Sequence, residues 1–466
     1  MYSLASAIPG PKNECPIIGV AHKMMGDIMY NLQEFCYDSI QHGGLIKAWL
    51  NHILYFLVTN PTDMEGILKT CLEKDDTHRF LRKVFGNGSN VDQFVAVFTE
   101  NSQKLVEKLV SHQGTGKFSI WPYLSTYTLD SLGETALGVK INSQDDPNSS
   151  FLKSINTILY LVNKRIFHLW LQPDWLFKLF PLYKLHQKCI KVLHNFTDEV
   201  IVKKRAEISQ YKKCQSQADN HYNRGEYQNN SFLDMLISIS GGENGYSNVE
   251  LREEVLTMTV AGTDTSATVI GYTLMLLAKY PKIQDKVYEE LYEIFGDSNR
   301  PVTKQDLVDM KCLERVVKES LRLFPPVPFI VRKVETEVKL PSGRILPAGT
   351  GAVLGIWGCH RDPKYWGPDA EHFDPDRFLP ERFNLEHACS YMPFSNGPRN
   401  CVGYQFALMS IKTSLAWILR NNKVVGEPED GPIPHIKVKF SIMMKDVTGY
   451  QVALEKRQPK FNIQSK

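Results

Sequence analysis

The sequence predicts a mainly α-helical chain with a minor β portion. From Val91 to about Glu293, apolar residues recur at spacings of three and four, which is the period of an amphipathic helix. Between Val331 and Val353, apolar and polar residues alternate as they do in strands. No repeat and no low-complexity tract divides the 466 residues, so we expect a single domain, 1–466.

Composition narrows the class of function. The 54 basic and 51 acidic residues leave a net charge of +3, which gives no reason to expect nucleic acid as a partner. Nine cysteines are scattered between Cys15 and Cys401 without a CxxC pair or zinc-type spacing. This pattern argues against a disulfide framework and favours a reducing compartment.

The N-terminal part of the sequence predicts a short segment without a membrane anchor, followed by a small sheet. Only Met1 to Ile8 precede Pro9-Gly10-Pro11, whereas a bilayer span needs roughly 20 apolar residues. The stretch also lacks the basic start and apolar core of a secretory signal. We therefore expect no N-terminal anchor, and interpret 1–11 as a truncated N-terminus with a proline hinge. Apolar runs such as 53–58, mixed with turn residues over 12–70, predict a small sheet beside helices.

The centre of the chain predicts a long helix. The polar stretch from Cys214 to Asn230 is a candidate mobile loop. Ser247 and Glu250 then form a capping-box signature, and apolar periodicity continues to Tyr280, before Pro281. The later elements are a helix over 311–324, strands over 331–353, a proline-rich coil over 361–394 and a last amphipathic helix after Cys401.

The string Phe394-Ser-Asn-Gly397-Pro-Arg399-Asn-Cys401-Val-Gly403 carries the chemistry. A helix N-terminus and free backbone N–H groups stabilise a thiolate at Cys401. Gly397 and Gly403 let the backbone approach a flat cofactor, and Arg399 can pair with a carboxylate. An isolated cysteine is more often a buried structural residue, but here the spacing outweighs that alternative.

This string resembles, at every fixed position, the FxxGxRxCxG haem-binding loop of the cytochrome P450 superfamily. Upstream, Glu319 and Arg322 match the ExxR motif and lie one helical turn apart, so that they can pair. Arg377 lies in a PERF-like element, 375–378. The resemblance implies the cytochrome P450 fold and a buried network of Glu319, Arg322 and Arg377 that supports the haem loop without a catalytic role.

A second motif lies within the long helix. Ala261-Gly262-Thr263-Asp264-Thr265 resembles the oxygen-activation motif AGx(D/E)T. Taken alone, the same residues would fit a helix kink with local Ser/Thr hydrogen bonds equally well. The resemblance implies that Gly262 loosens the helix so that oxygen fits, and that Asp264 and Thr265 relay protons. Thr265 also argues against the superfamily's isomerase-like members.

The resemblance implies a haem-thiolate monooxygenase with haem b held through Cys401 as metal ligand. Its electrons would come from NADPH through a separate NADPH–cytochrome P450 reductase, with cytochrome b5 as a second candidate donor. No GxGxxG fingerprint is evident, so the reductase is not fused to this chain. It also implies lipophilic substrates and the cytosolic face of the endoplasmic reticulum membrane. Residues 327–330 and 356–357 are candidate substrate contacts by position.

The stretch 312–326 is most similar to family 4 of the superfamily, insect members included. Many members there esterify the haem through a glutamate at the position of Ala261, a bond that alanine cannot form. The aromatic-rich run 166–183 contains Trp170, Trp175, Phe177 and Phe180. It could dip into a membrane surface or form a buried helix under the substrate pocket, and both interpretations stay open.

One departure from the family bears on activity. Family members carry a WxxxR motif before the region that matches 91–94, but here 85–89 runs directly into Asn90. We infer an internal deletion with a junction near 89–90, in a shortened isoform or an incomplete gene model. A catalytically impaired form that acts as a haem- or ligand-binding protein is therefore the second hypothesis. A structural helical protein without haem is the third.

Overall fold

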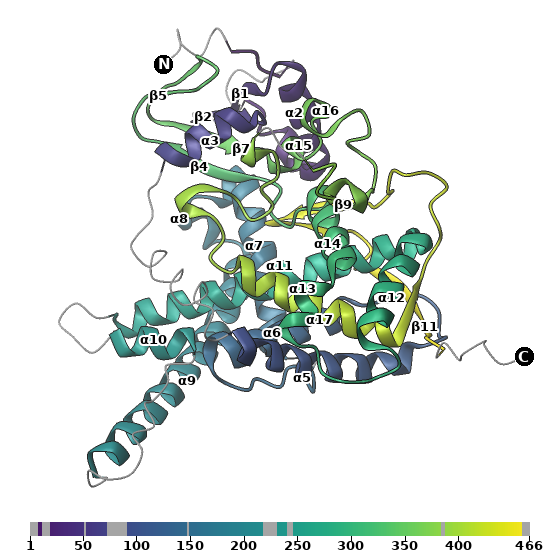
Figure 1. The fold of residues 1–466 in the computed structure, drawn as a ribbon. Helices are drawn as coiled ribbons and strands as arrows, with labels where there is room; N and C mark the ends of the chain where they lie inside the picture. The colour runs from purple at the N-terminus through teal and green to yellow at the C-terminus, as the bar shows by residue number, and fades with distance from the viewer. Residues whose placement is uncertain are drawn as a thin grey trace, which may run out of the picture.

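Long helices form most of the molecule, and small sheets lie beside them (Figure 1). The computed structural model describes residues 8–11, 19–50, 53–71, 91–146, 149–217, 231–239, 246–383 and 387–458. Within these ranges the α-helices are α2 (Ile28–Gln41), α3 (Pro61–Thr70), α5 (Val91–Leu109), α6 (Trp121–Leu132), α7 (Ser150–Phe167), α8 (Asp174–Phe177), α9 (Pro181–Gln217), α10 (Phe232–Ile239), α11 (Asn248–Lys279), α12 (Pro281–Phe295), α13 (Lys304–Asp309), α14 (Lys311–Leu323), α15 (Ile356–Cys359), α16 (Pro363–Trp366) and α17 (Tyr404–Asn421). Shorter helical turns are η1 (Lys23–Met25), η2 (Val110–His112), η3 (Gly133–Leu137), η4 (Leu169–Leu171), η5 (Pro375–Phe378), η6 (Ala388–Ser390) and η7 (Gly397–Arg399).

The long helix α11 lies at the centre (Figure 1). Both halves of its capping box form, because Ser247 Oγ accepts the N–H of Glu250 and the Glu250 carboxylate accepts the N–H of Ser247. Every residue over 267–278 is buried, since α6, α9, α14 and α17 pack around the helix. Pro281 then begins α12, at a position where a missing N–H leaves no hydrogen bond unmade.

The largest sheet, of strand order β1-β2-β7-β4, joins distant parts of the chain. The parallel pair β2/β7 lies between the antiparallel pairs β1/β2 and β4/β7. Gly351 packs under the ring of Tyr55, where an added Cβ would lie 2.4 Å from the ring. The strands are β1 (Leu45–Leu50), β2 (Ile53–Val58), β3 (Phe118–Ser119), β4 (Ile330–Val334), β5 (Val338–Lys339), β6 (Ile345–Leu346), β7 (Thr350–Leu354), β8 (Asn422–Val425), β9 (Val438–Ser441), β10 (Met443–Asp446) and β11 (Gln451–Lys456).

The last helix, α17, differs from its expected amphipathic form. All residues over 410–419 are buried, because α5, α11, α12 and α14 surround the helix. Even Lys412 lies inside, where its ammonium pairs with Glu314 at 3.0 Å and donates to the carbonyl of Leu307. The helix itself is confirmed, but its amphipathic character is lost over 410–419, because a lysine can be buried when a carboxylate and a carbonyl satisfy its charge and hydrogen bonds.

Most other predicted elements are confirmed. The mainly helical class, the strand 53–58, the helices that begin after Ser247 and at Lys311, and the strands within 331–353 are all present. The predicted loop is wrong over 214–217, which continue α9, whereas 218–230 lie outside the described residues. The four strands after α17 were not predicted. The N-terminal stretches 1–7 and 12–18 and the junction near 89–90 also lie outside the described residues. In the described part of the chain, no helix has the length and apolar character that a bilayer span requires.

Candidate functional site

A cavity of about 410 Å³ lies between the middle of α11 and the loop that precedes α17. Most side chains around it are apolar, and the polar exceptions include Thr265, Ser266 and Cys401. The lining residues are Leu132, Met258, Ala261, Gly262, Thr265, Ser266, Val269, Leu321, Pro326, Val327, Ile330, Ile356, Pro393, Phe394, Ser395, Cys401, Val402, Gly403, Phe406, Ala407 and Ile411. The structure therefore brings the cysteine string and the α11 motif to one cavity.

The cysteine loop has a defined backbone. Its turn includes Ser395 at φ +63° and Gly397 at φ +75°, and the N–H of Cys401 donates to the carbonyl of Phe394 at 2.8 Å. The Phe394 ring packs edge-on against Tyr404, with ring centroids 4.9 Å apart. Cys401 is thus placed three residues ahead of the start of α17, with its side chain on the cavity wall.

The surroundings of the Cys401 sulfur only partly favour a thiolate. Burial raises the pKa of the Cys401 thiol, and the backbone N–H of Gly403 opposes that effect. The described protein groups alone do not lower the pKa of this thiol, contrary to the expectation from the helix terminus. A bound metal cation would lower this pKa, because the charge of the metal deprotonates a coordinating thiol.

The three glycines of the two motifs have different surroundings. At Gly403 an added Cβ would meet nothing within 4 Å, so its backbone faces open cavity, as a flat ring requires. At Gly397 an added Cβ would lie 3.2 Å from the Leu68 carbonyl, and φ is positive, so the turn itself favours glycine. At Gly262 it would lie 2.8 Å from Leu132, so glycine allows α11 to pack on α6; the helix continues unbroken there.

Two arginines lie on segments that contribute to the cavity wall, β4 and the cysteine loop, although neither is itself a lining residue. Arg399 lies in η7, and Arg332 lies on β4. Burial lowers the pKa of Arg332, and the positive charge of Arg399 lowers it further. An anion such as a haem propionate would offset that unfavourable charge interaction. The sequence analysis missed Arg332. A charged residue at an inward position of a strand could have drawn attention to it, but the exposed Val331 beside it obscured the alternation of apolar and polar residues.

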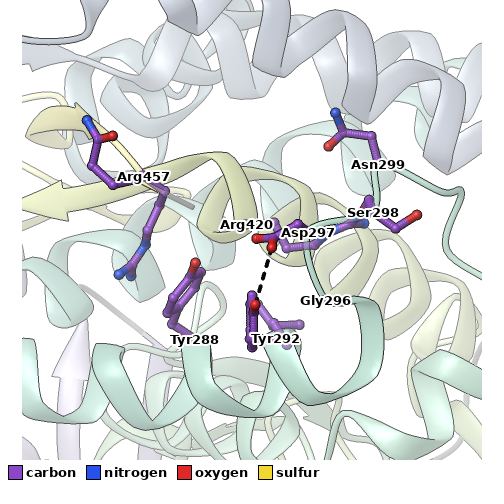
Figure 2. A pocket seen from close by; sticks show the side chains of 10 residues that line it. Tyr288, Tyr292, Gly296, Asp297, Ser298, Asn299, Arg420 and Arg457 are labelled. Atoms are coloured by element: carbon purple, nitrogen blue, oxygen red, sulfur yellow. Dashed lines mark hydrogen bonds between the residues drawn. The ribbon is translucent and has the colours of Figure 1, made fainter. Parts of the chain in front are cut away.

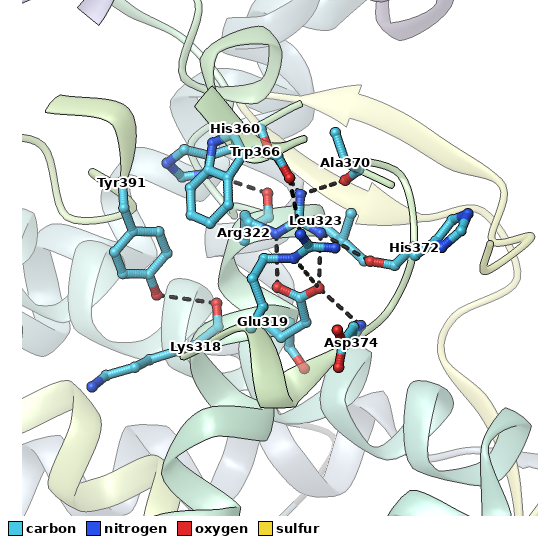
Figure 3. Close-up of polar contacts among 12 residues, drawn as sticks. Lys318, Glu319, Arg322, Leu323, His360, Trp366, Ala370, His372, Asp374 and Tyr391 are labelled. Carbon is cyan, nitrogen blue, oxygen red and sulfur yellow. Dashed lines mark hydrogen bonds and ion pairs between the residues drawn. The ribbon is translucent and has the colours of Figure 1, made fainter. Parts of the chain in front are cut away.

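The ExxR pair forms a bidentate ion pair in a fully buried site (Figure 3). Arg322 Nε and Nη2 donate to the two oxygens of Glu319 at 2.7 and 2.8 Å. The guanidinium also donates to three backbone carbonyls at 2.5–2.9 Å, those of His360, Ala370 and His372. A charge this deeply buried is stable only when its hydrogen bonds are satisfied, and these contacts fix the coil after α15 against α14.

Arg377 is buried near this pair, but its shorter ion pair is with Asp369 and not with Glu319. Its Nη2 lies 2.9 Å from Asp369 Oδ2, whereas its Nε lies 3.7 Å from Glu319 Oε1. It also donates to the carbonyls of Trp366 and Asp369. The hydrogen bond from Arg377 lowers the pKa of Asp369. The three predicted residues are therefore brought together, with Asp369 as a fourth member that the sequence analysis missed.

The α11 motif divides between two sides of the helix. Thr265 lines the cavity, and its hydroxyl donates to the Ala261 carbonyl at 2.7 Å. Asp264 is buried outside the cavity lining, where its carboxylate forms a 2.7 Å ion pair with Lys445 of β10. Burial raises the pKa of Asp264, and the Lys445 ammonium opposes that effect. The Lys445 ammonium also lies 4.5 Å from the centre of the Trp121 ring, and neither residue was predicted.

The candidate substrate contacts, 327–330 and 356–357, lie only partly at the cavity. Val327, Ile330 and Ile356 line the cavity, as the candidate substrate contacts require. Pro328, Phe329 and Trp357 belong to the same expectation but are not among the lining residues; the Trp357 ring stacks under the guanidinium of Arg361 at 4.1 Å. Ile356 and Trp357 are neighbours in the short helix α15, so their side chains point in different directions.

A smaller pocket of about 130 Å³ lies beside α12 and contains none of the predicted site residues (Figure 2). Arg457 lies over the Tyr288 ring at 3.8 Å, and Arg420 lies over the Phe295 ring at 3.9 Å. Arg420 also donates to the Ser298 carbonyl. Both guanidinium groups are bound by rings or carbonyls of the protein itself, so we interpret the pocket as a gap between packed elements.

The chain is similar to known proteins over most of its length. Residues 56–452 match the family model described as Cytochrome P450. The chain is 38% identical to "Cytochrome P450 4c3" of Drosophila melanogaster over 366 residues, which covers 77% of this chain and 68% of that protein. It is 33% identical to "Cytochrome P450 4V2" of Homo sapiens over 445 residues, which covers 89% and 83%. The fold matches the cytochrome P450DA heme domain with a TM-score of 0.78 at 21% identity, over 97% and 98% of the two chains.

Proposed function

The chain belongs to the cytochrome P450 family, close to family 4, and from that premise we propose that Cys401 is the ligand of its haem iron. Cytochromes P450 hold haem through a cysteine thiolate and are monooxygenases. The observation that carries the assignment is the position of Cys401, on the wall of an apolar cavity across from Thr265 of α11.

The chain's own residues would bind and orient the cofactor. Gly403 faces open cavity and offers its N–H to the Cys401 sulfur, and Arg399 and Arg332 would pair with the propionates. Phe394 forms part of the wall. When bound, haem with a thiolate ligand supplies dioxygen activation and the insertion of one oxygen atom into a C–H bond, with the other released as water.

We assign proton delivery to Thr265 and Asp264. Of these two residues, Thr265 lines the cavity and Asp264 does not, so the Thr265 hydroxyl would be the final proton donor. Asp264 can pass a proton to Thr265 only after its carboxylate leaves Lys445, 2.7 Å away. Lys445 therefore holds Asp264 in its resting position.

The partners follow from the family and from the cavity. The apolar lining suits a lipophilic substrate, and the electrons would come from NADPH through a separate NADPH–cytochrome P450 reductase, with cytochrome b5 as a second donor. We place this activity on the cytosolic face of the endoplasmic reticulum membrane, in a single domain, 1–466. The alternative function, a catalytically impaired short isoform that binds haem or ligand, is favoured by the missing WxxxR motif.

One experiment separates these two functions. The purified full chain is reduced under carbon monoxide, and NADPH oxidation and product formation are then followed with a reductase and a panel of fatty acids and hydrophobic probes. A thiolate-type Soret band with a hydroxylated product supports the monooxygenase. The band without any product supports the impaired form. Absence of haem from the folded chain would overturn the monooxygenase and leave, of the alternative, only a ligand-binding role.

Replacing Thr265 with valine is expected to uncouple electron flow from product formation. Valine keeps the shape but removes the hydroxyl on the cavity wall, so protons reach the oxygen less efficiently. We expect product formed per NADPH to fall by roughly 10²-fold, with hydrogen peroxide released instead. The T265S variant keeps the hydroxyl and serves as the control. Equal coupling in T265V and the wild type would contradict the assignment.

The aromatic-rich segment 166–183 is divided between surface and interior. Trp170, Trp175 and Leu179 are 46%, 70% and 74% exposed, whereas Phe177 is buried. The exposed side chains support the membrane interpretation, and no residue of the segment is among those that line the cavity. We propose that the exposed side chains enter the membrane interface, since an indole ring suits the boundary between acyl chains and headgroups.

Changing both Trp175 and Leu179 to serine is expected to weaken binding to phosphatidylcholine vesicles by roughly 10²-fold. The reason is that the apolar surface of two large side chains would no longer be transferred from water into the membrane interface. Co-sedimentation of the full chain measures the effect. The double variant V202S/V249S removes two other exposed side chains, 67% and 51% exposed on α9 and α11, and should bind like the wild type. Equal loss in both double variants would argue against a specific membrane face.

A further inference from the structure

His360 joins two distant segments of the chain. Its side chain is fully buried just after α15. Nδ1 lies 3.1 Å from the Arg322 carbonyl at the end of α14, and Nε2 accepts the backbone N–H of Met392 at 3.0 Å. Because a carbonyl can only accept and an N–H can only donate, the ring carries its proton on Nδ1 and is neutral. Burial, with the charges of Arg322 and Arg361, lowers the pKa of His360 to about 3, so the ring stays neutral.

Arg322 and His360 bind each other in both directions. Arg322 Nη1 donates to the carbonyl of His360 at 2.8 Å, while the imidazole donates to the carbonyl of Arg322. The Tyr391 ring stacks on the imidazole at 5.5 Å, and its hydroxyl donates to the Lys318 carbonyl at 3.0 Å (Figure 3). Residues 391–392, directly before the cysteine loop, are therefore held against α14 by two side chains.

The contact continues from Met392 to the cysteine through the backbone. Ser395 N–H donates to the carbonyl of Met392 at 2.9 Å, and Cys401 N–H donates to the carbonyl of Phe394 at 2.8 Å. His360 itself is not among the described residues that line the cavity. Its influence on the site must therefore pass through the loop.

We propose that His360 is a positioning residue that fixes the Cys401 loop to the buried Glu319–Arg322 pair. Arg322 holds the coil at 360–372, and the neutral imidazole carries that restraint to Met392 and the loop. Without the bridge, the loop is free to shift, and Cys401 would no longer be held where it could bind a haem iron. The proposal rests on Cys401 being the iron ligand, which is part of the proposed function.

Variants at position 360 separate the two hydrogen bonds of the imidazole, one to the Arg322 carbonyl and one from the Met392 N–H. The Asn amide in H360N can reach only the place of Nδ1, whereas the longer Gln amide in H360Q reaches the place of Nε2 and can still accept the Met392 N–H. H360F keeps a ring and makes neither hydrogen bond. I155A is the control for general loss of stability, because it truncates a buried side chain on α7 in a different part of the core.

The first readout is the ligand of the iron. In H360F and H360N we expect bound haem, but the fraction with a thiolate-type band in the reduced carbon monoxide spectrum should fall about tenfold, the lower end of the effect of supporting groups at metal sites. H360Q should recover most of that fraction, and I155A should keep it. A wild-type thiolate fraction in H360N and H360F would overturn the proposal.

The second readout needs no cofactor. Amide hydrogen exchange of the haem-free full chain should be faster over 391–401 in H360N than in the wild type, and unchanged there in H360Q and I155A. Equal exchange in H360N and the wild type would overturn the proposal even if H360F fails to fold. If the wild type itself shows no thiolate-type band, the proposed function fails, whereas this comparison still decides the role of His360.

Discussion

Replacing Cys401 with serine is expected to remove the thiolate-type Soret band and all product formation. A serine hydroxyl is neither ionised at neutral pH nor a good ligand for this iron, and electron donation by the sulfur is what favours cleavage of the O–O bond. The cavity itself should persist, because the side chain lies on its wall and the change is nearly isosteric. The measurement is the carbon monoxide difference spectrum, with the haem content determined separately.

The matched control is C312S, which changes a partly buried cysteine near the start of α14, outside the cavity lining. It should retain the band and the activity. A thiolate-type band that survives in C401S would mean that another cysteine ligates the iron. Cys389, which is buried and accepts a hydrogen bond from Asn396, would then be the first to change.

Replacing Glu319 with glutamine is expected to destabilise the chain by about 3–5 kcal/mol, the usual effect of removing one member of a buried ion pair. The cause is Arg322, whose guanidinium is fully buried and would lose its only ionic partner among the described residues. Haem retention should fall with stability, since the coil that Arg322 holds leads to the cysteine loop. Urea denaturation of the folded chain measures the free energy of unfolding.

The control for this prediction is E65Q on α3. Glu65 and Lys69 also form an ion pair, at 2.6 Å, but their side chains are 39% and 65% exposed. An exposed pair contributes only about 0.2–1 kcal/mol, so E65Q should unfold almost like the wild type. Equal effects in the two variants would show that Arg322 relaxes to other partners when Glu319 is lost.

The sequence could predict what depends on neighbours in the chain. The capping box at Ser247, the proline after Tyr280 and the string that contains Cys401 are local signals, and each was found where the pattern placed it. The ExxR pair is also local, because its two members lie one turn apart on α14. The family resemblance implied that the cysteine string and the α11 motif serve one site, and residues of both line one cavity.

The rest depends on contacts between distant segments. Nothing near Asp264 indicates that Lys445, far along the chain, forms its ion pair. Asp369 was missed although it lies only eight residues before Arg377, because the local pattern does not indicate that the coil turns back on itself there. Arg332 was missed because the exposed Val331 beside it obscured the strand alternation. The strands β8 to β11 are short and were hidden by weak alternation; β8 is defined by its pairing with the distant β11, whereas β9 and β10 form a local hairpin.

The order of synthesis gives the Glu319–Arg322 anchor a further consequence. Its partners at residues 360, 370 and 372, and Arg377 beside them, all leave the ribosome before Cys401. Chains emerge from the N-terminus, so this support can form while the cysteine loop is still being made. Haem capture would then be a late step in biogenesis, in which the last helix closes over an already assembled support.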